Sequence, residues 1–88
     1  MDDRYYKNIP HKTIERLSQY RRALQIYSDK GKTHIFSHEI AALLHITAVQ
    51  VRRDLMLIGY SGSLRKGYDI SDLITLIGDL IDSPGGQR

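Results

Sequence analysis

The side chains best suited to chemistry lie in one stretch, TAVQVRRDLMLIG, over residues 47–59. Thr47 and Gln50 have the spacing of a helix capping box, and apolar residues then recur at the spacing of a single helix face. Those apolar residues are Val51, Leu55 and Ile58. Gln50, Arg52 and Arg53 are left on or near the outer face of the same helix. Arginine can donate two hydrogen bonds to guanine and glutamine can pair with adenine, so this helix is suited to reading base edges in DNA.

Other residues could add DNA contacts around this helix. The side-chain methyl groups of Thr47 and Ala48 could touch the methyl group of a thymine. Lys12 and Thr13, and separately Ser37, lie at the starts of two other predicted helices. Backbone N–H groups at a helix start can bind a phosphate, so these residues are candidate backbone contacts.

A basic pair, Arg65 and Lys66, lies in a stretch rich in glycine and serine over residues 59–70. This composition predicts a β-hairpin, or wing, that follows the DNA backbone or places an arginine in a narrow minor groove. The alternative for this pair is a charged turn that only favours solubility. Asp54 has another predicted role, because an acid beside two arginines repels phosphate. We expect Asp54 to pair with a basic group of another helix or to orient an arginine.

The elements that position these residues follow from periodicity and from capping and turn residues. In chain order they are a helix over 11–29 after Pro10, a short strand over 33–36, a helix over 38–45 capped by Ser37, a helix from Thr47 to about 58, a hairpin over 59–70, and a helix over 72–81 capped by Ser71. A short helix, a tight turn and a basic helix, followed by a wing, predict a winged helix-turn-helix of mainly α (α+β) class.

Length and charge agree with a small polyanion-binding domain. The 88 residues predict one domain, 1–88, with flexible ends over 1–8 and 83–88. Residues 4–66 hold twelve Lys or Arg and four acids, a net charge of +8, whereas the C-terminal part is acidic. The chain has no cysteine, no apolar run long enough for a membrane span and no signal-peptide pattern. We expect a cytoplasmic protein with no membrane partner.

Catalysis and metal binding are not predicted. The four histidines lack the spacing of a metal site within one helix, and no paired acids or phosphate-binding loop is present. We therefore expect no enzyme activity. The last helix supports a rival hypothesis, because Ile74 and Ile81 widen its apolar stripe beyond one face. That helix, 71–82, could be deeply packed, could join two copies into a homodimer, or could make the domain a protein–protein interaction module.

The chain resembles the N-terminal winged-helix domain of the Rex redox-sensing transcriptional repressors. Three segments carry the resemblance, namely IPHKTIERLSQYRRAL over 9–24, TAVQVRRDLMLIG over 47–59 and GYDISDL over 67–73. The VRRDL core is shared with DeoR-type repressors, whereas the first and third segments favour Rex. The family wing usually reads GKRGVGY, while this chain has GSLRKGY over 62–68, so its basic pair is shifted two positions toward the C-terminus.

The resemblance implies a bacterial repressor that binds a palindromic, AT-rich operator as a dimer and is associated with the nucleoid. It places the recognition helix, about 47–58, in the major groove and the wing, about 60–69, at the minor groove or backbone. Gln50, Arg52 and Arg53 would contact bases, and Lys12 would contact the backbone. In the family NAD(H) binds a second, Rossmann-type domain. These 88 residues contain no dinucleotide fingerprint, so we expect no cofactor and no redox sensing in this chain itself.

Overall fold

The computed structural model describes residues 9–63 and 65–82, so the predicted flexible ends, 1–8 and 83–88, lie outside the described residues. The elements are α2 (His11–Asp29), β1 (His34–Ile35), α3 (Ser37–Leu44), α4 (Ala48–Leu57), β2 (Tyr68–Asp69) and α5 (Ile70–Asp82). In the described part of the chain, four helices thus accompany one two-stranded antiparallel sheet, which confirms the predicted winged-helix class.

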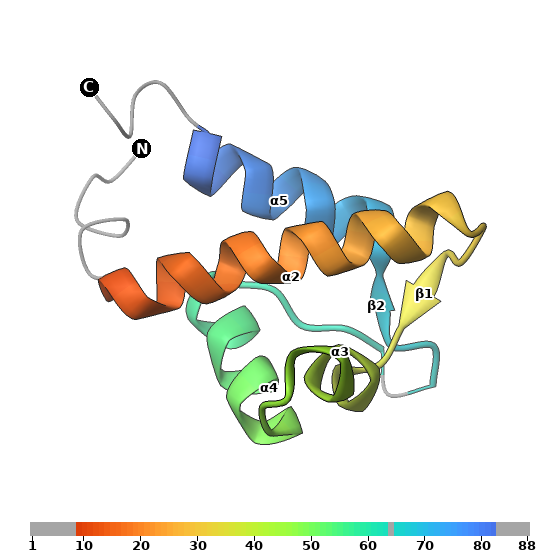
Figure 1. The fold of residues 1–88 in the computed structure, drawn as a ribbon, viewed down its shortest axis with the longest axis horizontal. Helices are drawn as coiled ribbons and strands as arrows, with labels where there is room; N and C mark the ends of the chain where they lie inside the picture. The colour runs from red at the N-terminus through yellow and green to blue at the C-terminus, as the bar shows by residue number, and fades with distance from the viewer. Residues whose placement is uncertain (1–8, 64, 83–88) are drawn as a thin grey trace.

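The helices form two layers (Figure 1). The long helices α2 and α5 lie side by side, while α3 and α4 lie below α2 and the two strands close one end. Helix α2 begins where the carbonyl of Pro10 accepts the N–H groups of Thr13 and Ile14, at 3.0 and 3.1 Å. It ends before Gly31, whose φ is +88°. These bounds match the predicted helix over 11–29. Its inner face carries Leu17, Tyr20 and Leu24, all fully buried in the core.

The helix-turn-helix is formed by α3 and α4. His45 ends α3 in the left-handed conformation, with φ 60° and ψ 41°, and the N–H of Ile46 returns to the carbonyl of Ala41 at 3.1 Å. The prediction that Ser37 caps α3 is wrong, because Ser37 is already helical and Phe36 holds the cap position. There the N–H of Phe36 donates to the Glu39 carboxylate at 2.8 Å. This bond and nearby Lys32 lower the pKa of Glu39, because both stabilise its charged form.

Helix α5 begins one residue earlier than the predicted cap. The carboxylate of Asp69 accepts the N–H of Asp72 at 2.9 Å, so Asp69 has the role predicted for Ser71, which is helical and exposed. The early start buries Ile70. Ile74 and Ile81 are half-buried against the core. This agrees with the packed-helix alternative, while self-association of α5 remains a prediction.

The wing is shorter than the predicted hairpin over 59–70. Ser63 and Gly67 exchange two backbone hydrogen bonds, of 3.0 and 2.8 Å, and close a tight turn. Beyond Gly67 the chain does not continue that hairpin, because β2 pairs with β1 in the register His34–Asp69 and Ile35–Tyr68. The root of the wing is therefore fixed to the strand that precedes the helix-turn-helix.

Gly67 lies where the wing meets β1, and its backbone passes close to that strand. Its φ is +85°, and a Cβ built there would lie 2.5 Å from the backbone oxygen of Ile35. Gly31 has nearly the same φ, but a Cβ there meets nothing within 4 Å. The two glycines therefore share the cost of a left-handed conformation and differ only in steric contact.

We expect Gly31→Ala to lower the free energy of unfolding by about 1 kcal/mol, the cost of a left-handed alanine. Gly67→Ala should cost roughly 1–3 kcal/mol more, because the added methyl group must displace backbone. Urea unfolding followed by circular dichroism measures both. Equal losses would show that the close approach at Gly67 does not constrain the wing.

Candidate nucleic-acid interface

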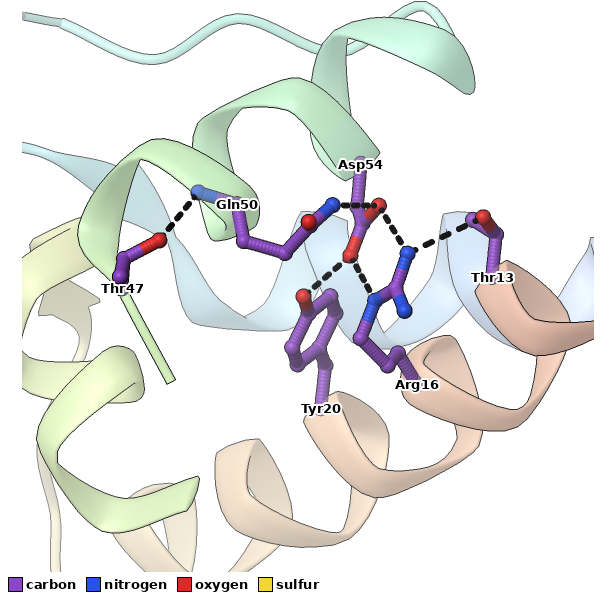
Figure 2. A network of polar contacts seen from close by, with 6 residues as sticks. All are labelled: Thr13, Arg16, Tyr20, Thr47, Gln50 and Asp54. Atoms are coloured by element: carbon purple, nitrogen blue, oxygen red, sulfur yellow. Dashed lines mark hydrogen bonds and ion pairs between the residues drawn. The ribbon is translucent and has the colours of Figure 1, made fainter. Parts of the chain in front are cut away.

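The carboxylate of Asp54 anchors α4 to α2 (Figure 2). Asp54 is 2% exposed, and its two oxygens accept hydrogen bonds from the guanidinium of Arg16 at 2.7 Å from Nε and 3.0 Å from Nη2. The hydroxyl of Tyr20 donates to the same carboxylate. A buried charge is tolerated only when it is paired and hydrogen-bonded, and this pair meets both conditions. The prediction that Asp54 pairs with a basic group of another helix is confirmed.

Two further contacts complete the network. The amide nitrogen of Gln50 donates to Asp54 at 2.9 Å, and Arg16 Nη2 also donates to the Thr13 hydroxyl at 3.2 Å. Burial raises the pKa of the Tyr20 phenol, and the hydrogen bond to Asp54 raises it further, so Tyr20 keeps its proton and remains a donor. Among the described residues, no buried side-chain nitrogen or oxygen lacks a partner.

The network changes the predicted roles of two residues. Thr13 is 4% exposed and its hydroxyl accepts from Arg16, so this side chain is not placed to bind a phosphate. Gln50 donates one of its two amide N–H groups to Asp54, so its amide is held beside the carboxylate and has one N–H and the carbonyl oxygen left for a base. Arg16 was not among the residues singled out from the sequence. Periodicity alone could not reveal its partner, which lies 38 residues away in sequence.

The N-terminus of α4 has the predicted cap, since the Thr47 hydroxyl accepts the N–H of Gln50 at 3.1 Å. Its inner face is also as predicted. The buried residues there include Val51 and Leu55, and Ile58 follows at the cap. Ala48 is half-buried and packs against the core, so its methyl group is only partly accessible to DNA.

The outer face of α4 carries both arginines. Arg52 and Arg53 are exposed, and Arg52 Nη1 donates to the Ser37 hydroxyl at 3.3 Å. Ser37 thus belongs to the site through its side chain and not as a cap. Val49 and Met56 are exposed on the same face, and the set of predicted contact residues omitted both. The sequence signal that could have identified them is their position. They are apolar residues, seven apart, that fall beside the arginines and outside the periodicity of the inner face.

A hollow of about 380 Å³ joins this face to the wing. Its walls come from the first turn of α3, the last turns of α4 and the wing, including Ser37, Arg52, Met56 and Ser63. Arg65 and Lys66 are exposed at the tip, where their backbone N–H groups each donate to the Ser63 hydroxyl at 3.1 Å. The structure therefore brings α4, Ser37 and the wing around one concave surface.

Lys12 lies apart from that hollow, exposed on the first turn of α2. Within residues 9–63 and 65–82, no cluster of three or more potential metal ligands occurs. Over the same residues, no helix combines the length and apolarity needed to cross a bilayer.

Comparison with known proteins gives a consistent result. Residues 8–55 match a family model described as "Putative DNA-binding protein N-terminus". The redox-sensing transcriptional repressor Rex of Streptococcus thermophilus is 36% identical over 78 residues, which cover 89% of this chain and 36% of that protein. Rex proteins of Carboxydothermus hydrogenoformans and Desulforamulus reducens are 41% and 42% identical over 66 residues, which cover 75% of this chain and 32% and 31% of those proteins. The chain thus spans about a third of the length of these relatives.

We expect Asp54→Ala to lower the free energy of unfolding by about 3–5 kcal/mol, because it leaves a partly buried arginine, the buried Tyr20 hydroxyl and the half-buried Gln50 amide without their acceptor. Tyr20→Phe removes one bond to a charged group and should cost roughly 1.5–3 kcal/mol. Asp79→Ala, on the exposed face of α5, is the matched control and should change stability by less than about 0.5 kcal/mol. Thermal unfolding measures all three. An Asp54 variant as stable as the Asp79 variant would contradict the anchoring role.

Proposed function

The chain belongs to the family of the N-terminal DNA-binding domain of Rex repressors, and we propose that it binds operator DNA with sequence specificity as part of a transcriptional repressor. The observation that carries this proposal is the outer face of α4, where Arg52 and Arg53 are exposed and Arg52 shares a hollow with the wing that carries the exposed Arg65 and Lys66. The neighbouring acid, Asp54, is buried and paired with Arg16, so its charge is compensated before a phosphate approaches.

In the proposed complex α4 lies in the major groove, the usual position of the second helix of a helix-turn-helix. Arg53 reaches guanine, because its guanidinium can donate two parallel hydrogen bonds to that base. Arg52 lies toward Ser37 and suits a contact at the edge of the groove. Arg65 and Lys66 contact the backbone or minor groove, and Lys12 adds a phosphate contact at the start of α2.

Several finer features are also proposals. A palindromic, AT-rich operator needs two copies of the domain, and we propose a homodimer in which α5 takes part through its half-buried residues Ile74 and Ile81.

The relatives are named redox-sensing, and they are about three times as long as this chain. We propose that the part described here supplies DNA contacts only, with no NAD(H) site and no enzyme activity. A repressor of this kind acts in the cytoplasm, at the nucleoid.

The proposal predicts specific binding with a steep dependence on salt. A half-site that neutralises about four phosphates gives a slope near −4 for log affinity against log salt. Fluorescence anisotropy with an AT-rich palindrome and with a scrambled duplex of equal composition measures both properties. Preference for the palindrome that persists as salt rises is expected. Absence of binding even at low salt would overturn the proposal and favour a protein-interaction module.

We expect Arg53→Ala to weaken binding of the preferred duplex by about 1–3 kcal/mol and to relax its specificity at one base pair. Arg22→Ala removes the same charge from the exposed surface of α2 and is the control, with little loss expected. Anisotropy titrations at one salt concentration compare the two variants. Equal affinities would remove Arg53 from base recognition.

A further inference from the structure

Three large apolar side chains, Val49, Met56 and Leu57, are exposed on the helix that carries the arginines, and two of them lie between those arginines. Val49 is 50% exposed and Met56 is 70% exposed. They are seven residues apart, so they lie about 20° apart around α4 and about 10.5 Å apart along it. On the same geometry, Arg52 lies about 60° to one side of Val49 and Arg53 about 40° to the other. The outer face is thus an apolar line between two cations, which we call the apolar stripe of α4, Val49 and Met56.

The charges around this stripe restrict what can cover it. An apolar protein surface would leave Arg52 and Arg53 buried without a counter-charge, which is costly. The cationic wing, with Arg65 and Lys66, extends the same positive field. The matching partner has small apolar groups set within a surface of negative charge. The DNA major groove has this composition, because thymine places a methyl group among base edges that phosphates flank.

We propose that Val49 and Met56 read thymine methyl groups in the major groove, at two positions no more than about three base pairs apart. The limit follows from the length of the stripe and the rise of about 3.4 Å per base pair, because a helix inclined to the DNA axis spans fewer base pairs than a parallel one. This inference rests on the proposed DNA-binding function and adds specificity to it. It also moves the thymine contact away from the residues predicted from sequence, since Ala48 packs against the core.

The experiment replaces thymine by deoxyuridine, which removes the methyl group and leaves the base-pairing edge unchanged. The probe is the tightest-binding duplex selected from a randomised pool, with each thymine replaced singly. Wild-type protein is compared with Val49→Ser, which removes both methyl groups of the side chain, and with Met56→Gln, which keeps its length. Ile26→Ser is the matched control, because Ile26 is 47% exposed on α2. All substituted residues are exposed, and thermal unfolding checks that each variant folds.

Wild-type affinity should fall about fourfold at two thymine positions, the value of one buried methyl group. Val49→Ser should abolish the methyl effect at one position and Met56→Gln at the other, while Ile26→Ser should retain both. Specific binding with no loss at any deoxyuridine would overturn the inference and leave the proposed function standing. Methyl effects that persist in both variants would also overturn it. Absence of any binding would overturn the inference together with the proposed function.

Discussion

The buried carboxylate of Asp54 is the constraint on which the DNA-facing surface depends. Its charge lies inside the domain, where only paired and hydrogen-bonded charges are tolerated. It is satisfied only when α4 lies against α2 with Arg16 and Tyr20 in reach. The position of the proposed recognition helix is therefore set by directional polar bonds as well as by apolar packing, and such bonds specify rotation about the helix axis more narrowly than apolar contacts do.

The polar side chains of α4 have three different roles around this anchor. Gln50 is one helical turn before Asp54 and is drawn into the network. Arg53, which lies about 100° around the helix from Asp54, is exposed. Arg52 contacts Ser37 and so connects the two helices of the helix-turn-helix across their outer edge. A stretch that appears uniformly polar in sequence thus contains one structural residue, one bridging residue and one exposed cation.

The sequence was sufficient to predict the helices, because apolar periodicity and a proline or glycine at the ends determine where α2 and α4 begin and end. It also indicated that Asp54 is structural, since a free acid there would oppose phosphate binding. It could not identify Arg16 as the partner, because polar residues that enter a core break the periodicity on which the prediction depends. The predicted caps at Ser37 and Ser71 were wrong for another reason, because a nearby carboxylate fixes each helix start earlier in the chain. Glu39 accepts the N–H of Phe36, and Asp69 accepts the N–H of Asp72 in place of a serine hydroxyl.

The root and the tip of the wing are held very differently. At the root, β2 is paired with β1, Tyr68 is buried, and Tyr60 accepts the N–H of Asp69. At the tip, two backbone bonds between Ser63 and Gly67 close the turn, and the Ser63 hydroxyl accepts the N–H groups of Arg65 and Lys66. The root is thus held by bonds to β1, whereas the tip is held by bonds within its own turn. In the proposed complex, the cations of the wing and the base-reading face of α4 are fixed by separate sets of bonds, so a substitution in one set leaves the other intact.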